Sequence, residues 1–408
     1  MTTNGTRPLD VATIRKDFPI FETGIAYLDS ANTSQRPRQV TGAMLDYFEH
    51  FNSNIHRAAY HIAEVATERY EGTREKVRAF VNAASTKEII YTRGTTEAIN
   101  LVAYAWGRKN VKAGDLIVLT ILDHHSNIVP WQILAAANGA HIEYVDIDER
   151  GELRLDQFHE LLERSPKLVA FSQVSNALGT INPAGEMVAA AKAAGATVLV
   201  DGAQGAPHQG VDVRTLGCDF YAFSGHKMLG PTGAGILYGR RELLEAMDPF
   251  QSGGDMIKTV RIEGTTYHDL PWKFEAGTQA IGEVIGLGAA VDYLAGLGME
   301  AVRTHEREIT EYAYEALSDI EGLTLYGPPP SRRAGVVSFS LEGIHPHDLA
   351  TIADRDQVCL RAGHHCAMPL MTRLGVVATA RASFYVYTQK DEVDRLVSSI
   401  KEAQRIFK

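Results

Sequence analysis

One pattern repeats between residues 88 and 239 and limits the folds that this chain can adopt. Short apolar segments, bounded by Gly, Asp or Ser, alternate with longer amphipathic stretches. This alternation predicts strands joined by helices, and therefore a mostly parallel sheet with helices on its faces. The predicted strands are Glu88–Thr92, Leu116–Thr120, His141–Val145, Leu168–Ser172, Thr197–Asp201, Phe220–Ser224 and Gly235–Tyr238. The predicted helices are Thr95–Trp106, Ile128–Asn138, Leu155–Leu162 and Ala184–Ala194.

A different pattern begins near Gly282, with two long helical stretches that run to Leu317 and then a turn-rich Gly-Pro-Pro-Pro segment. The later predicted elements, which suit a small α+β layer, are strands Gly335–Ser340, Val358–Arg361 and Arg381–Tyr387 and helices Pro346–Ala353 and Asp391–Ile406. A chain of 408 residues also exceeds the size at which one core stops growing. We therefore expect a large α/β domain over residues 25–285 and a smaller α+β domain over residues 286–408. The N-terminal residues 1–24 would belong to the smaller domain.

Charge and cysteine content argue against several classes of protein. A net charge of −10 does not favour nucleic acid as a partner, because such binding needs clustered Lys and Arg. The sequence has neither a signal-like start nor an apolar run of about 18 residues, so we expect a cytoplasmic protein that does not enter a membrane. None of the three cysteines forms a Cys-x-x-Cys pair, which argues against a disulfide framework or a cysteine-rich zinc site.

Polar residues follow four of the predicted strands, whose carboxyl ends would meet at one edge of the sheet, where ligands bind in such folds. Asp201 ends one strand, and Lys227 follows another. Thr95 and Thr96 open a helix, whose first N–H groups and dipole could hold a phosphate. His124 begins a His-His pair after a further strand.

Each of these residues has an ordinary alternative role. Asp201 could cap a turn, and Lys227 could be a solvated surface charge. Thr95, Thr96 and Glu97 could form a capping box. The paired histidines could suggest a metal, but the other ligands of a zinc site are missing at metal spacing.

Together, the four features predict one cofactor. They would supply a phosphate seat, a flat ring to stack on an aromatic ring, an acid to pair with a pyridinium nitrogen, and a lysine amine that can attack an aldehyde. Pyridoxal phosphate imposes these needs on its protein. We therefore predict pyridoxal 5'-phosphate as the cofactor and no bound metal.

Cys366 differs from the other two cysteines in its surroundings. It stands in Arg361-Ala-Gly-His-His-Cys366, and nearby cations and imidazoles favour the reactive thiolate form. A cysteine is more often a small buried apolar residue, and Cys218 and Cys359 fit that description. Cys366 is therefore the candidate nucleophile.

Two apparent nucleotide-binding signals fail. In Gly233-Ala-Gly235-Ile-Leu-Tyr-Gly239 the third glycine comes one place late, and the segment leads into a predicted strand instead of a helix. No Gly-Lys-Ser or Gly-Lys-Thr occurs either, so a Walker phosphate loop is absent. These failures count against a nicotinamide-dependent dehydrogenase.

The chain resembles the SUF-type (group II) cysteine desulfurases and selenocysteine lyases of the class V aminotransferase family. The likeness runs from Ala26-Tyr-Leu-Asp-Ser30 to Glu392-Val-Asp394, which is nearly the whole chain. Its most specific strings are Arg93-Gly-Thr-Thr-Glu97, His124-His-Ser-Asn-Ile-Val-Pro-Trp131, Val200-Asp-Gly-Ala-Gln204, Phe223-Ser-Gly-His-Lys227, Phe274-Glu-Ala-Gly-Thr278 and Arg361-Ala-Gly-His-His-Cys366. The resemblance implies the type I fold of pyridoxal-phosphate-dependent transferases.

The resemblance also implies a role for each site residue. Lys227 would carry the cofactor, Asp201 would keep its pyridine nitrogen protonated, and His124 would stack on its ring. The other cofactor contacts would be Gln204 on the phenolic oxygen and Thr95, Thr96, Ser224, His226 and, from a second subunit, Thr278 on the phosphate. The substrate side would comprise Asn176 and Arg381 on the carboxylate, with Arg361, His56 and His364 nearby.

These roles imply removal of sulfur from L-cysteine, giving L-alanine and a persulfide on Cys366 that passes to an acceptor for iron–sulfur cluster assembly. A short loop before Cys366 implies an acceptor of the SufE or SufU type, and the family implies a homodimer. The chain departs from its relatives at Asn32 and Thr33, where alanines are usual, and at residues 60–63. The alternatives are a selenocysteine lyase, a C–S lyase that stores no sulfur, and a non-catalytic scaffold.

Overall fold

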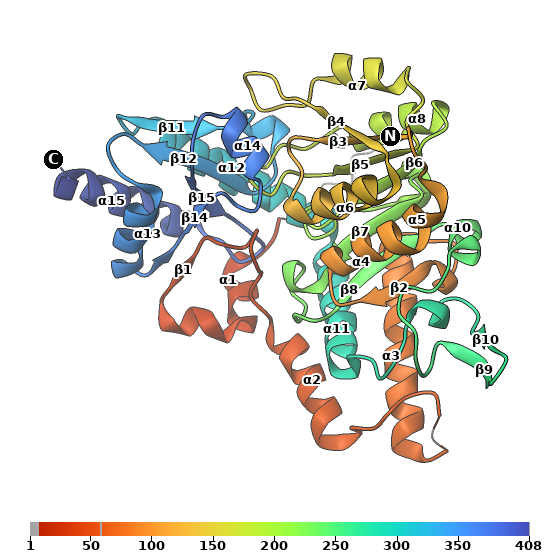
Figure 1. Ribbon diagram of the computed structural model, residues 1–408. Helices are drawn as coiled ribbons and strands as arrows, with labels where there is room; N and C mark the ends of the chain where they lie inside the picture. The colour runs from red at the N-terminus through yellow and green to blue at the C-terminus, as the bar shows by residue number, and fades with distance from the viewer. Residues whose placement is uncertain (1–7, 58, 408) are drawn as a thin grey trace, which may run out of the picture.

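A seven-stranded sheet forms the centre of the computed structural model, which describes residues 8–57 and 59–407 (Figure 1). Its strands are β2 (Ile89–Thr92), β3 (Leu116–Thr120), β4 (His141–Val145), β5 (Leu168–Ser172), β6 (Thr197–Asp201), β7 (Phe220–Ser224) and β8 (Gly235–Gly239). Their order in space is β2-β8-β7-β6-β5-β3-β4, and β8 runs antiparallel to the rest. The predicted mostly parallel α/β sheet is confirmed.

Helices cover both faces of this sheet, because successive side chains of each strand point to opposite sides. In β3, Leu116 and Val118 enter one apolar core, whereas Ile117 and Leu119 enter another. The first core takes side chains from α3 (His61–Phe80), α7 (Leu155–Leu162), α8 (Ala184–Ala193), α9 (Val213–Leu216) and α11 (Ile281–Leu297). The second takes them from α4 (Thr95–Leu101), α6 (Val129–Asn138) and α10 (Arg241–Ala246). Strands buried on both faces explain the continuous apolar runs in the sequence.

A smaller sheet lies beside the large one (Figure 1) and has its own core. Its antiparallel strands, in spatial order, are β11 (Leu323–Tyr326), β12 (Val336–Leu341), β15 (Thr379–Ser383) and β14 (Arg361–Gly363). The helices of this part are α12 (Met299–Ser318), α13 (Pro346–Arg355), α14 (Met368–Arg373) and α15 (Lys390–Phe407). The short β1 (Ala26–Tyr27) pairs in parallel with β13 (Val358–Cys359), after α1 (Val11–Ile14). The predicted limits of the two domains stay a prediction.

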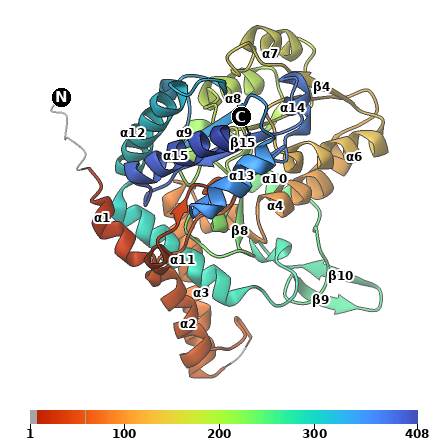
Figure 2. The same ribbon diagram turned by 90° about the vertical axis from the view of Figure 1, so that its left-hand side faces the viewer.

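Two N-terminal helices were not predicted from the sequence. α2 (Arg38–His50) and α3 pack along α11 and extend away from the two sheets (Figures 1 and 2). Within the described chain, no single helix is both long enough and apolar enough to cross a membrane. The helices α11 and α12 reach that length and composition together, but the pair is bent by 77°.

Several predicted boundaries differ from the structure. Glu88 lies outside β2, because its carboxylate accepts the N–H groups of Ala84 and Ser85 at the turn before the strand. The helix that begins at Thr95 is α-helical only to Leu101 and continues through wider π-helical turns over Val102–Gly107 into α5 (Arg108–Asn110). The last predicted strand stops at Ser383, because the backbone then turns and the Tyr385 N–H bonds to the Thr388 hydroxyl.

The structure also contains a hairpin that sequence pattern could not reveal. Strands β9 (Ile257–Arg261) and β10 (Gly264–Tyr267) pair only with each other and project from the molecule (Figure 2). Nearly all of their side chains are exposed, so neither strand has the alternation of apolar and polar residues that marks a half-buried strand.

Candidate active site

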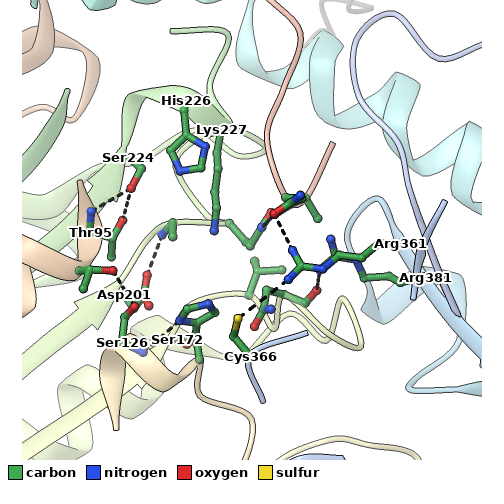
Figure 3. Close-up of a pocket in the computed structure, with 18 residues that line it drawn as sticks. Thr95, Ser126, Ser172, Asp201, Ser224, His226, Lys227, Arg361, Cys366 and Arg381 are labelled. Carbon is green, nitrogen blue, oxygen red and sulfur yellow. Dashed lines mark hydrogen bonds between the residues drawn. The ribbon is translucent and has the colours of Figure 1, made fainter. Parts of the chain in front are cut away.

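A pocket lies where the carboxyl edge of the large sheet meets the small sheet (Figure 3). Side chains from β6, from the loops after β3 and β7 and from the start of α4 form one wall. Side chains from β14, β15 and the loop between them form the opposite wall. Most predicted site residues line this pocket: Thr95, Thr96, His124, Asn176, Asp201, Gln204, Ser224, His226, Lys227, Arg361, Cys366 and Arg381.

Lys227 follows β7 in a single 3-10 turn, and its side chain extends into the pocket (Figure 3). No hydrogen bond or ion pair of its amine is found within residues 8–57 and 59–407. Burial lowers the pKa of Lys227 to about 8, although the Asp201 carboxylate acts in the opposite direction and Arg381 and Arg361 add to the decrease. Near neutral pH, a substantial fraction of this amine is therefore unprotonated and nucleophilic.

Asp201 ends β6 and is almost completely buried. Its Oδ1 accepts the Ala203 N–H at 2.9 Å, which is the turn-capping role expected of an Asp at this position. Burial raises the pKa of this carboxyl group. Because the side chain also lines the pocket, it is placed both to cap the turn and to pair with a cationic nitrogen of a ligand.

The start of α4 and the end of β7 bring three hydroxyl groups together. The Thr95 N–H donates to the Ser224 hydroxyl at 2.8 Å, and the two hydroxyls lie 2.7 Å apart. The Thr96 hydroxyl lies 2.7 Å from that of Ser126. Gly235, at the start of β8, allows Gly94 to approach closely, because a Cβ on Gly235 would lie 2.3 Å from the Gly94 Cα. Hydroxyls and N–H groups at a helix start suit a phosphate.

The alternative of a capping box at this helix is wrong. The cap position is Gly94, which offers no side chain, and the Glu97 carboxylate accepts the N–H of Arg93, which precedes the cap, at 2.5 Å. The two threonine hydroxyls therefore remain directed to the pocket and to neighbouring serines.

His124 lies in the loop after β3, and its protonation state follows from its contacts. The Ser126 N–H donates to Nδ1 at 3.0 Å, so the ring proton is on Nε2. Burial, together with the positive charge of Lys227, lowers the pKa of His124 to about 3. The ring is therefore neutral near pH 7, and it lines the pocket, where it could stack on an aromatic ring.

The buried Asp123 side chain holds the loop after β3 in place. Its carboxylate accepts the N–H and hydroxyl of Thr120, the N–H and hydroxyl of Ser172, and the amide of Asn127. Because Thr120 ends β3 and Ser172 ends β5, one buried side chain joins two strand ends to the loop that presents His124.

Cys366 lies in a tight turn between β14 and α14. Both His365 and Cys366 have positive φ, at 52° and 55°, which is uncommon for residues with a side chain and raises the thiol toward the pocket. The Cys366 N–H donates to Nδ1 of His364 at 3.0 Å, and the His125 N–H donates to the Cys366 carbonyl at 2.8 Å. Arg361 Nη2 lies 3.9 Å from Sγ (Figure 3).

Arg381 and Asn176 join the two walls. Arg381 donates from Nη1 to the Asn176 carbonyl at 2.8 Å and from Nη2 to Asp29 at 3.0 Å. Its Nε is buried and has no partner in the described part of the chain. The Asn176 amide donates to the His365 carbonyl at 2.6 Å and so fixes the turn that carries the thiol. Burial lowers the pKa of Arg381 to about 10, so the guanidinium stays charged near neutral pH.

Comparison with known proteins identifies the family. The sequence matches the model of the aminotransferase class-V family over residues 26–396. The chain belongs to the class V aminotransferases. A probable cysteine desulfurase of Halalkalibacterium halodurans is 50% identical over 399 residues, which are 97% of this chain and 98% of that protein. A probable cysteine desulfurase of Staphylococcus epidermidis is 51% identical over 403 residues, which are 98% of each chain.

Solved structures of related enzymes have the same fold. The cysteine desulfurase CsdA of Escherichia coli, solved in an S-sulfonic acid form, matches with a TM-score of 0.93 and 38% identity over 98% of this chain and 100% of that chain. A cysteine desulfurase of Thermococcus onnurineus, solved in its apo form, matches with a TM-score of 0.93 and 39% identity over 97% and 98% of the two chains.

Three predicted site residues of this class V aminotransferase lie outside the pocket. His56 lines a separate groove with Trp272 and pairs with Glu71 at 2.9 Å. Thr278 lines a third cavity. His364 lies beside the thiol turn, where its imidazole accepts the Cys366 N–H at Nδ1 and its ring centroid is 5.6 Å from that of His125. Nothing in the structure tests the roles predicted for these three residues.

The structure adds pocket residues that sequence reasoning did not select, among them Ser126, Ser172 and Asn32. Ser126 could have been found, because it follows His124 within the same specific string. Ser172 ends β5 at the carboxyl edge, a position that also marks candidate residues. No group of three or more His, Cys, Asp or Glu side chains that could hold a metal ion occurs in the described ranges.

Proposed function

We propose that this class V aminotransferase is a pyridoxal-phosphate-dependent cysteine desulfurase, which removes sulfur from L-cysteine and releases L-alanine. One observation carries the proposal: the Lys227 amine and the Cys366 thiol, from different sheets, line the same pocket. An amine that holds an aldehyde cofactor and a thiol that accepts sulfur are the two reactive groups that this reaction needs.

The residues on the large-sheet side fit the cofactor. Bound pyridoxal phosphate withdraws electrons from a substrate amino acid and so makes its Cα proton acidic. Asp201, which is buried and lines the pocket, would pair with the pyridine nitrogen and keep it protonated. Lys227 would hold the aldehyde carbon of the cofactor, and its amine, when free, would be placed to take the Cα proton of the substrate. A pKa near 8 suits this base.

Arg381 and Arg361 supply the positive charge on the substrate side. Arg381 is fixed at two nitrogens by Asn176 and Asp29, so its guanidinium is already oriented for a carboxylate. Arg361 Nη2 lies 3.9 Å from the Cys366 sulfur, so a cationic group stands beside the thiol.

The sulfur step then uses Cys366 as the nucleophile. Its thiolate attacks the substrate sulfur, a new S–S bond forms, and the substrate Cβ–S bond breaks. The electron pair of the broken bond goes to the Cβ side, where a proton completes the methyl group of alanine. The sulfur remains on the enzyme as a persulfide.

The persulfide needs an acceptor, and we assign this role to a protein of the SufE or SufU type that supplies iron–sulfur cluster assembly. The turn that carries Cys366 is held by His125, Asn176 and His364, so the sulfur cannot travel far from the pocket. A homodimer accompanies this proposal, because Thr278 lies outside the pocket and is expected to serve the site of a second subunit.

Mass spectrometry after incubation with L-cysteine tests the proposal. We expect one extra sulfur atom on the Cys366 peptide and production of alanine. Cys366→Ala should lose both, whereas Cys359→Ala, which changes a half-buried thiol away from this pocket, should keep both. Pyruvate and free sulfide, without sulfur on Cys366, would instead identify a C–S lyase. Selenocysteine turnover that persists in Cys366→Ala would identify a selenocysteine lyase.

A colour test distinguishes an enzyme from a scaffold. The purified protein should be yellow or become yellow with added pyridoxal phosphate, and Lys227→Ala should not retain the cofactor covalently. A wild-type protein that stays colourless would support a non-catalytic scaffold.

A further inference from the structure

A buried chain of polar side chains leads from the pocket to the helix α12. Gln204 lines the pocket, His208 lies four residues later in the same loop, and Glu306 belongs to α12. The exposed fractions of the three residues are 2%, 3% and 0%. Buried polar groups of this kind are costly unless they are hydrogen-bonded, so their contacts decide what they do.

The orientation of the Gln204 amide is fixed at both ends. Its Nε2 donates to the Ala31 carbonyl at 2.6 Å, and a carbonyl can only accept, so the nitrogen must be on that side. The amide oxygen Oε1 then faces His208 Nε2 at 3.2 Å. Because an amide oxygen also only accepts, His208 Nε2 must carry a proton and donate it.

Because Nε2 of His208 carries one proton, a second proton must lie between Nδ1 of His208 and the Glu306 carboxyl group. Nδ1 of His208 lies 2.8 Å from Oε1 of Glu306. With Nε2 protonated, a neutral imidazole would present a lone pair at Nδ1 to a carboxylate oxygen, and the two would repel. Either His208 is an imidazolium or Glu306 is a neutral acid, and in both states one proton joins the two atoms.

The surroundings give His208 no competing partner. The Tyr385 ring packs edge-on against the imidazole at 4.9 Å, and its hydroxyl donates to the Pro207 carbonyl. The second oxygen of Glu306 has no hydrogen-bond partner in the described ranges, so His208 is the one side chain there that hydrogen-bonds to the carboxyl group, while Arg303 and His305 of the same helix lie close enough to interact with its charge. The chain Glu306–His208–Gln204 therefore runs in one direction, toward the pocket.

We propose that Glu306 and His208 are positioning residues that act through Gln204 on the cofactor. They hold the amide so that one Nε2 hydrogen bonds Ala31 and the other is available to a ligand oxygen in the pocket. Donation from His208 to Oε1 also polarises the amide and strengthens it as a donor. The inference rests on the proposed function, since it concerns the phenolic oxygen of bound pyridoxal phosphate.

The test uses the cofactor-loaded full-length protein and a readout other than turnover: the pH midpoint of the visible absorbance of the bound cofactor. A weaker donor stabilises the ring oxygen less as an anion, so the midpoint should move to higher pH. For His208→Phe, which keeps an aromatic ring beside Tyr385, we expect an increase of about half to one pH unit, the shift that corresponds to one hydrogen bond. Glu306→Leu should shift the midpoint in the same direction.

Rescue and a double-variant comparison separate positioning from general damage to the structure. In Glu306→Gln the new amide can donate to His208 Nδ1, so less than half of the shift should remain. In a Gln204→Ala background, His208→Phe should cause no further shift, because the pathway to the cofactor is already broken. The matched control is His305→Phe, which changes the adjacent buried histidine of α12 and should leave the midpoint in place.

Three results would overturn the proposal: no shift in His208→Phe or Glu306→Leu, an equal shift in His305→Phe, or a full further shift in the Gln204→Ala background. Should His208→Phe fail to fold, the comparison of Glu306→Leu with Glu306→Gln decides alone. A wild-type protein without a visible band would refute the proposed function itself. A coloured wild type with unshifted variants would refute only the positioning role.

Discussion

At the scale of single residues, Lys227 is the side chain whose behaviour depends most on its surroundings. Burial is the largest cause of the decrease of its pKa from 10.5 to about 8, and the Asp201 carboxylate limits that decrease. A buried amine with a lowered pKa is reactive at a pH where an exposed lysine is almost fully protonated.

This setting predicts how cofactor loading depends on pH. Only the unprotonated amine attacks the aldehyde, so the rate at which apo-protein binds pyridoxal phosphate should rise about tenfold per pH unit below the midpoint and level off above pH 8. The rise of the visible absorbance after mixing at several pH values measures this rate. In Asp201→Asn the carboxylate that raises the pKa is gone, so the midpoint should move to lower pH. A midpoint above pH 10 would contradict the prediction.

Asn32 is the second residue whose effect can be predicted. Its Oδ1 accepts Nη1 of Arg361 at 2.5 Å, and its amide donates to Asp29, which also holds Arg381. Replacement of Asn32 by alanine frees Arg361 from this contact. We expect Asn32→Ala to slow alkylation of Cys366 by iodoacetamide about two- to fivefold. This is the size of effect expected when the partly exposed hydrogen bond that holds Arg361 beside the thiol is lost.

An additional comparison shows whether Asn32 acts through the guanidinium. In an Arg361→Ala background, Asn32→Ala should leave the alkylation rate unchanged, because the group that it orients is absent. Equal slowing in both backgrounds would contradict this explanation. Labelling should be followed on the Cys366 peptide, since Cys359 is also partly exposed.

At the scale of elements, one buried ion pair ties α3 to the large sheet and to the loop before α11. Arg74 donates to both oxygens of Glu275, at 2.7 and 2.9 Å, and also to the Ile89 carbonyl, while Glu275 accepts the Tyr91 N–H. The exposed fractions of the Arg74 and Glu275 side chains are 1% and 2%. Glu275 lies within the Phe-Glu-Ala-Gly-Thr string of the family, so this part of the string has a structural role.

Breaking this pair should destabilise the fold strongly. Glu275→Ala removes one of the two carboxylates that pair with the buried Arg74 guanidinium, since Glu71 remains at 2.8 Å, and it leaves the Tyr91 N–H without its acceptor. We expect a loss of about 3 kcal/mol in the free energy of unfolding. Denaturant unfolding followed by circular dichroism measures the change. The control is Glu75→Ala, which removes an exposed partner of Arg78 on the same helix and should cost less than about 1 kcal/mol. Equal losses in the two variants would contradict the prediction.

At the scale of the whole molecule, the features that could be predicted from the sequence are those that the local pattern of residues determines. Buried strands have continuous apolar runs, and their carboxyl ends meet at one edge, so Asp201, Lys227 and His124 could be placed together in advance. The contact between His208 and Glu306 could not, because it joins residues 98 positions apart through packing of α12. The exposed β9–β10 hairpin has no apolar pattern, and the place of Thr278 in a cavity outside the pocket depends on tertiary packing.

The pocket unites both sheets, and this architecture predicts how the cofactor affects stability. Asp201 and Lys227 belong to one sheet and Arg361 and Arg381 to the other, so the complete pocket exists only when both parts are folded. A ligand that binds only the folded state stabilises it by about 2.7 kcal/mol at a hundredfold excess over its Kd. Removing pyridoxal phosphate should therefore lower the Tm by roughly 5 °C. Lys227→Ala should lose much of this effect because the covalent link is gone, whereas Cys366→Ala should keep it. Equal Tm values with and without cofactor would show that the pocket does not couple cofactor binding to folding.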